Sequence, residues 1–209
     1  MTFFTEPKLL NAQRWKNMRI GILGGSFNPP HVGHVHISQM ALKSLRLDAV
    51  WWLVTPLNPL KSPDELLSVE KRVALSRKIN TNPKIIVTGM EEGFDTHYSY
   101  ATIKILKKNF PSTQFAWIAG MDNIRNFHLW QNWKDFLSEM CMIHVTRHPP
   151  VQLIQQCPLR MLSSQRHIFV DHGGALPLDS NTSYWLFQKK MVNISSTELR
   201  EEKLYNTIS

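Results

Sequence analysis

The chain has 209 residues, of which 43% are hydrophobic and 19% charged, so it can bury a substantial core and does not resemble a disordered protein. Its net charge of +8 favours anionic partners, either nucleic acid or small phosphorylated molecules. No apolar run is long enough to span a bilayer, and residues 1–17 lack the layout of a signal peptide. We therefore expect a cytoplasmic protein with no membrane partner. It should have an N-terminal tail over residues 1–17 and a single domain over residues 18–209.

Short apolar runs alternate along the chain with longer amphipathic segments. The predicted strands cover residues 19–24, 49–54, 84–88, 115–119, 140–145 and 167–170, and the predicted helices cover 34–47, 66–79, 98–109, 130–139 and 196–204. This alternation predicts an α/β fold, a single doubly wound, Rossmann-like domain with a mainly parallel sheet covered on both faces. In such sheets, ligands bind beyond the carboxyl ends of the strands, where the strand order reverses.

The first informative motif leaves the first predicted strand and enters the first predicted helix. It runs from Gly24 to His34 and reads Gly-Gly-Ser-Phe-Asn-Pro-Pro-His-Val-Gly-His. We expect its two leading glycines to let the backbone turn sharply and approach a ligand closely. A helix N-terminus offers free N–H groups and a positive dipole end, which suits phosphate. His31 and His34, three residues apart, can face one point and donate to charge that builds on a phosphoryl group.

A zinc site is the alternative interpretation of two histidines at this spacing. Zinc would need two further ligands, and no Cys or His cluster follows at metal-ligand spacing. Cys141 and Cys157 belong to no paired motif, so we expect two reduced thiols. The sequence therefore predicts no metal held by protein ligands. The segment is also neither a Walker loop, which requires Gly-Lys-Ser/Thr, nor a G-x-G-x-x-G loop.

A second polar motif lies at the start of the last predicted helix. It reads Ile194-Ser-Ser-Thr-Glu-Leu-Arg200 and combines three hydroxyls with an arginine one turn into the helix. Hydroxyls, backbone N–H groups and an arginine fork can together hold a triphosphate tail. A capping box formed by Ser195 and Glu198 is the structural alternative.

The two motifs together resemble the signatures of the nucleotidyltransferase superfamily that carries the H-x-G-H motif. The Ser-Phe-Asn-Pro version of the first motif resembles the pyridine-nucleotide branch, and the resemblance extends from Met18 to Arg200. It implies an adenylyltransferase of NAD biosynthesis that transfers AMP from ATP to nicotinate mononucleotide and releases pyrophosphate. Mg2+ would be carried mainly by ATP. A monomer and a homo-oligomer both remain open.

The resemblance also implies a role for individual residues. His31, His34 and Arg200 would be catalytic, with the histidines on the α-phosphate and Arg200 on the departing pyrophosphate. The ATP site would comprise Gly24, Gly25, Ser26, Phe27, His31, Gly33, His34, Gly120, Asp122, Ile194, Ser195, Ser196, Thr197 and Arg200. The mononucleotide site would comprise Ser26, Asn28, Lys61, Ser99, Trp130 and Arg147.

Several of these residues have a structural alternative. Lys61 can be an exposed surface lysine, and Asp122 can be a helix cap. In the W-x-x-W pair, we expect Trp130 to stack on the pyridine ring and Trp133 to pack in the core. The match to the family is weaker at Ala101, where members tend to have Asp or Gln.

Other functions stay open at this point. A transferase of the same superfamily could use nicotinamide mononucleotide or phosphopantetheine as the acceptor, and the nicotinate preference rests on analogy with bacterial enzymes. A basic nucleic-acid-binding module would suit the charge and the 7 tryptophans. The chain lacks RNP, KH and helix-turn-helix signatures, so we expect no nucleic-acid partner.

Overall fold

The computed structural model describes residues 4–56, 66–145, 157–170 and 172–187, without the side chains of Met121, Asp122 and Arg125. The strands are β1 Arg19–Gly25, β2 Ala49–Val54, β3 Ile85–Thr88, β4 Gln114–Gly120, β5 Cys141–Val145, β6 Arg166–Val170 and β7 Thr182–Leu186. The α-helices are α1 Val32–Ser44, α2 Val69–Ile79, α3 Ser99–Asn109 and α4 Trp133–Glu139. Short 3-10 helices are η1 Leu9–Trp15, η2 Met90–Gly93, η3 Met121–Leu129 and η4 Pro158–Met161. No described helix is long and apolar enough to cross a bilayer.

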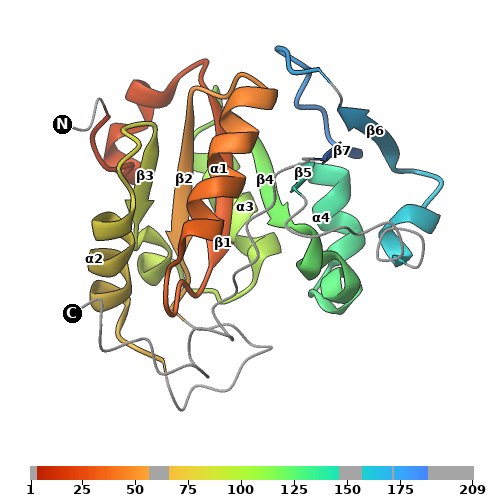
Figure 1. Cartoon of the computed structure of the whole chain (residues 1–209). Helices are drawn as coiled ribbons and strands as arrows, with labels where there is room; N and C mark the ends of the chain where they lie inside the picture. The colour runs from red at the N-terminus through yellow and green to blue at the C-terminus, as the bar shows by residue number, and fades with distance from the viewer. Residues whose placement is uncertain (1–3, 57–65, 146–156, 171, 188–209) are drawn as a thin grey trace.

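The strands form one seven-stranded sheet in the order β3-β2-β1-β4-β5-β7-β6, and every described pairing is parallel (Figure 1). The predicted doubly wound α/β fold is confirmed. The strand order reverses between β1 and β4, so the loops that follow these two strands flank the crevice where such folds bind ligands.

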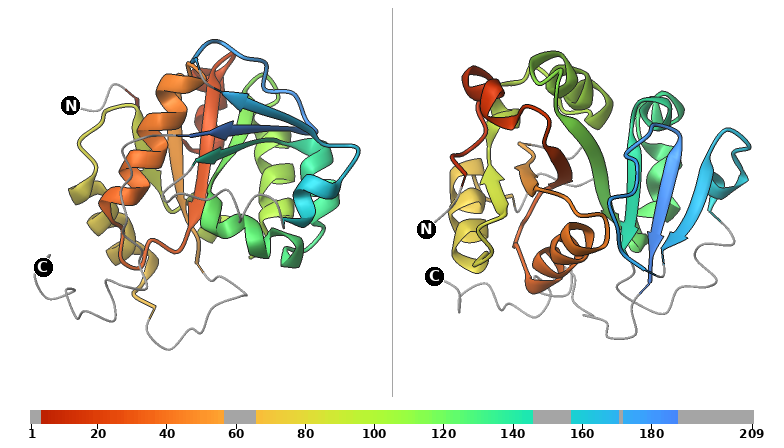
Figure 2. Two further views of the ribbon diagram at one scale, coloured as in Figure 1. Left: turned by 45° about the vertical axis from the view of Figure 1, so that its right-hand side comes forward. Right: turned by 90° about the horizontal axis from the view of Figure 1, so that it is seen from above.

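Helices cover both faces of the sheet, with α1 on one face and α3 and α4 on the other (Figure 2). Two apolar clusters result, one beneath α1 and α2 and one beneath α3, α4 and η1. β2 shows why the sequence produces this arrangement, since all six of its residues are buried. Trp51 lies in the α3 cluster and Trp52 in the α1 cluster, because successive side chains of a strand point to opposite faces.

Several predicted helix boundaries shift by one to three residues, including the end of α1, at Ser44 rather than at residue 47, and the start of α3, at Ser99 rather than at residue 98. α2 begins at Val69 rather than at residue 66 because the Ser68 hydroxyl accepts a hydrogen bond from the Lys71 N–H and caps the helix. α1 begins two residues earlier than predicted, at Val32. α4 begins at Trp133 because the preceding residues belong to η3.

β7 was not predicted. Its sequence, Thr-Ser-Tyr-Trp-Leu, is short and half polar, yet all five residues are buried between β5 and β6. Ser183 can be buried because its hydroxyl and the Gln165 side-chain amide form a hydrogen bond at 2.9 Å. The strand is therefore defined by its two neighbours and not by local hydrophobic alternation.

The described part of the N-terminal segment packs on the domain. Trp15 is 1% exposed and meets Trp51 edge to face at 4.8 Å. Glu6 forms a salt bridge with Arg77 at 2.7 Å. Between this segment, α2 and η2 lies a cavity of about 500 Å³, at the β3 edge of the sheet and away from the β1–β4 crevice.

Candidate active site

The loop between β1 and α1 carries the first motif and lies at the carboxyl edge of the sheet. Its polar side chains Ser26, Asn28 and His31 are all buried. The chain reverses at Phe27, whose φ of 48° lies in the left-handed region, and at a cis peptide bond between Asn28 and Pro29. Gly24 and Gly25 belong to β1, and no described glycine has a positive φ. The prediction that these glycines make the turn is therefore wrong.

The surroundings of Gly24 and Gly25 differ in whether they leave room for a side chain. A Cβ on Gly24 would come within 2.6 Å of the Trp117 indole on the neighbouring strand β4, so a buried tryptophan requires this glycine. A Cβ on Gly25 would meet only the Phe27 ring, at an ordinary 3.5 Å. The protein's own described packing thus tolerates a side chain at position 25, and a closely approaching ligand is the remaining physical reason for a glycine there.

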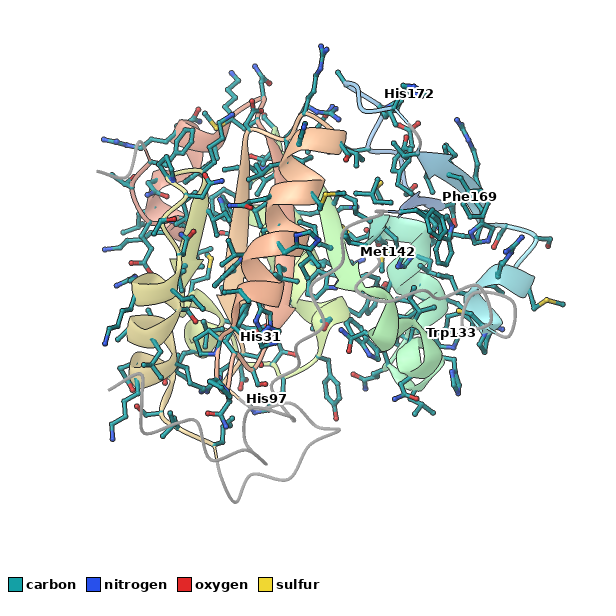
Figure 3. All side chains as sticks on the ribbon, viewed as in Figure 1. His31, His97, Trp133, Met142, Phe169 and His172 are labelled. Atoms are coloured by element: carbon teal, nitrogen blue, oxygen red, sulfur yellow. The ribbon has the colours of Figure 1, made fainter. Side chains whose placement is uncertain are left out.

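His31 and His34 lie together at the start of α1. Their ring centroids are 3.8 Å apart, and the His31 backbone N–H donates to Nδ1 of His34 at 3.1 Å. The His34 N–H in turn donates to the His31 carbonyl at 2.9 Å. Because Nδ1 of His34 accepts a hydrogen bond, the proton of the neutral imidazole resides on Nε2, which becomes a donor. His31 is labelled in Figure 3 at the N-terminal end of α1.

Aromatic packing holds the His34 ring in place. Its centroid is 4.7 Å from Phe27 and 5.9 Å from Trp52, and Phe27 stacks on Trp52 at 5.0 Å. The Trp52 indole N–H donates to the Ser38 hydroxyl at 2.8 Å, and that hydroxyl donates to the His34 carbonyl at 2.8 Å. Sequence reasoning placed Trp52 in a strand but did not find this support, because its residues come from three separate segments.

The end of β4 lies on the other side of the point where the strand order reverses. Gly120 is the last residue of this strand and is in register with Val145 of β5, and η3 begins at Met121. Gly120 and the backbone of Asp122 therefore lie at the same sheet edge as the β1–α1 loop. Gly33 is buried in the first turn of α1, and Ser99 is the half-buried first residue of α3.

Trp130 and Trp133 both pack against the core and both remain partly exposed. The Trp130 ring lies 5.0 Å from Phe127, 5.9 Å from Phe136 and 6.0 Å from Trp117. Trp133 contacts Phe127 at 6.3 Å. Because Trp117 also lies against Gly24, Trp130 connects to the first motif through a single intervening ring. Stacking of Trp130 on a pyridine ring stays a prediction.

The remaining predicted site residues lie outside the described part of the chain. They are Lys61, Arg147, Ile194, Ser195, Ser196, Thr197 and Arg200. That the second motif lies beside the first therefore also stays a prediction.

Glu91 is a buried carboxyl group that sequence reasoning missed. It belongs to η2 and is 3% exposed, and the Thr102 hydroxyl of α3 donates to its Oε1 at 2.5 Å. Among the described residues, its Oε2 has no hydrogen-bond partner. Burial raises the pKa of Glu91 to about 7, although the hydrogen bond from Thr102 opposes this shift. No local signal marks Glu91, since Glu92 beside it is exposed.

Taken together, a histidine pair at a helix N-terminus and a glycine-ended strand at the switch point define an α/β nucleotide-binding protein. Residues 22–202 match the cytidylyltransferase-like family, and the chain belongs to this family.

Several curated relatives align over most of the chain. The probable nicotinate-nucleotide adenylyltransferase of Rhizobium meliloti is 34% identical over 186 residues, which cover 89% of this chain and 99% of the relative. The protein of the same description from Agrobacterium fabrum is 36% identical over 183 residues, with 88% and 98% covered. A solved structure of Plasmodium falciparum nicotinic acid mononucleotide adenylyltransferase complexed with NaAD shares the fold. Its TM-score is 0.64 at 20% identity, with 88% of this chain and 83% of that chain covered.

Proposed function

We propose that this protein is a nicotinate-nucleotide adenylyltransferase. It transfers AMP from ATP to nicotinate mononucleotide and releases pyrophosphate. The observation that carries the proposal is the contact between His31 and His34 at the start of α1, beside the reversal of strand order. The near full-length alignment with relatives described as probable enzymes of this activity supports the choice of substrates.

The reaction is an in-line attack of the mononucleotide phosphate on the α-phosphorus of ATP. The new bond joins this phosphate oxygen to the α-phosphorus, and the bond from the α-phosphorus to the bridging oxygen of pyrophosphate breaks. The nucleophile is already anionic at neutral pH, so catalysis depends on positioning and on stabilising charge. His34 can donate from Nε2 to the α-phosphate, because Nδ1 is occupied by the His31 N–H. The N-terminus of α1 adds backbone donors and a positive dipole end beside it.

ATP would lie across the crevice between β1 and β4. Gly25 lets the triphosphate approach the backbone closely, and Gly120 and Asp122 would bind the ribose. Ser195, Ser196, Thr197 and Arg200 would hold the pyrophosphate, and this assignment rests on their motif alone. Mg2+ would enter with ATP, be held mainly by the nucleotide, and offset the negative charge of its phosphates.

Nicotinate mononucleotide would bind on the other side of the same loop. Ser26 and Lys61 would hold its phosphate, and Trp130 would stack on the pyridine ring. Asn28, Ser99 and Arg147 would complete this site; Asn28 and Ser99 are, respectively, buried and half-buried in the described structure.

The test compares acceptors in one assay. The protein is incubated with MgATP and nicotinate mononucleotide, nicotinamide mononucleotide or phosphopantetheine, and pyrophosphate release is followed while the product is identified by mass. We expect the highest kcat/KM with nicotinate mononucleotide. A higher kcat/KM with phosphopantetheine, or no pyrophosphate with any acceptor, would contradict the proposal.

A further inference from the structure

Arg72 is a buried cation beneath the candidate site. It lies in the first turns of α2 and is 1% exposed. Among the described residues, no carboxylate lies within salt-bridge distance of its guanidinium, and the three described salt bridges involve other residues. Burial lowers the pKa of Arg72, whereas the more distant Glu92 and Glu70 raise it. An arginine in a folded protein stays protonated, so this positive charge is buried without a contact to any carboxylate of the described residues.

The guanidinium is instead bound to four backbone carbonyls. Nη1 donates to Ser26 and to Thr55, each at 2.7 Å, and Nη2 donates to Pro56 at 3.2 Å. Nε donates to Leu67 at 2.7 Å. These carbonyls belong to the β1–α1 loop, to the end of β2 and to the segment before α2. One side chain therefore ties together three segments that are far apart in the sequence.

The same network reaches a second residue of the first motif. The Leu67 N–H donates to Oδ1 of Asn28 at 3.4 Å, so Leu67 connects Asn28 to Arg72. The Thr55 N–H donates to the Gly25 carbonyl at 2.9 Å, which joins the ends of β1 and β2. Ser26 and Asn28 are the two mononucleotide-site residues expected in this loop, and both depend on the Arg72 network.

The orientation of the loop follows from these bonds. The Ser26 carbonyl points toward the guanidinium, and a trans peptide places its C=O and the next N–H on opposite sides. The Phe27 N–H therefore points away from Arg72. The Ser26 carbonyl oxygen, which would repel a phosphate, is occupied by the Arg72 guanidinium beneath the loop.

We infer that Arg72 is a positioning residue for the mononucleotide phosphate. It fixes the Ser26 carbonyl against the end of β2, connects to the Asn28 side chain through Leu67, and places a buried positive charge behind the loop that an anion would approach. This inference rests on the proposed function and names the part of the site that Arg72 serves.

The experiment uses Arg72→Lys, which retains the charge and loses the fork, and Arg72→Met, which loses both. Arg77→Met is the matched control, because Arg77 lies on the same helix but is exposed and paired with Glu6. We measure KM for nicotinate mononucleotide and for ATP separately, with thermal unfolding of each variant. Because Arg72→Lys loses charge-assisted hydrogen bonds, we expect its KM for the mononucleotide to be about tenfold higher than that of the wild type. Arg72→Met also loses the charge, so we expect its KM to be about a hundredfold higher. The KM for ATP should rise by a smaller factor than the KM for the mononucleotide, because Ser26 belongs to both predicted sites and Asn28 only to the mononucleotide site. Arg77→Met should match the wild type.

A second measurement separates this inference from the proposed function. Inorganic phosphate should bind the wild type and lose affinity in Arg72→Lys by about the same tenfold factor, in an equilibrium titration that needs no turnover. If the wild type forms no dinucleotide, the proposed function fails, and the phosphate titration alone decides the role of Arg72. Should Arg72→Met fail to fold, Arg72→Lys decides it. Equal increases in both KM values, or a phosphate affinity unchanged in Arg72→Lys, would overturn the inference.

Discussion

Replacing Glu91 with glutamine should change how the stability of the protein depends on pH. In the unfolded chain this carboxyl group has its ordinary pKa of about 4.5, and in the folded protein burial raises the pKa to about 7. A group with a raised folded pKa contributes stability that is fully present below the unfolded pKa and is lost as the pH rises through the folded pKa. Each unit of difference between the two pKa values corresponds to about 1.4 kcal/mol. The free energy of unfolding should therefore fall by about 3 kcal/mol as the pH rises from 4.5 to 7.

The measurement is urea unfolding of the wild type and of Glu91→Gln at several pH values from 4.5 to 7.5. Glutamine keeps the shape of the side chain and the acceptor for the Thr102 hydroxyl but cannot ionise. The difference in free energy of unfolding, wild type minus variant, should fall by about 3 kcal/mol across this range, because other titrating groups cancel. Glu92→Gln, an exposed neighbour in the same 3-10 helix, is the control and should leave the pH dependence of the wild type unchanged. A difference that stays constant from pH 4.5 to pH 7.5 would refute the reasoning.

Four further variants test the site. His34→Ala should lower kcat for dinucleotide formation by about 10²-fold, as expected for a lost preorganised donor, and a kcat near that of the wild type would contradict the assignment. Trp130→Ala should mainly raise KM for the mononucleotide; an unchanged KM with a large drop in melting temperature would instead make Trp130 a core residue. Gly24→Ala should lower the free energy of unfolding by about 1–3 kcal/mol, because its Cβ would overlap the Trp117 indole. Gly25→Ala should leave stability nearly unchanged and raise KM for ATP, and equal destabilisation of the two variants would rule out the distinction.

Local patterns in the sequence predicted much of the fold. Six of the seven described strands and the four described α-helices follow from apolar periodicity, since strands buried on both faces and amphipathic helices leave different spacings. The closeness of His31 and His34 also followed from spacing, because residues three apart at a helix start are neighbours wherever the helix packs.

The turn after β1 shows where local reasoning fails. Two adjacent glycines indicated a turn, but the chain reverses at Phe27, and Gly24 is required by the Trp117 indole of another strand. The position of a glycine in the sequence does not show whether it is needed for its backbone conformation or for the room that it leaves to a neighbouring side chain. Only the register between β1 and β4, where Ile22 pairs with Trp117, distinguishes the two.

The sequence by itself determined the α/β class and the positions of most strands and helices, because these depend on contacts between near neighbours. It also contains the two polar motifs that we expect to bind phosphate. Only the tertiary structure decided the strand order, the burial of Trp15 against Trp51, and the environments of Arg72 and Glu91. Each of these depends on partners many residues away. The local sequence around a charged side chain does not predict whether that side chain will be exposed to water or buried among backbone carbonyls in the folded protein.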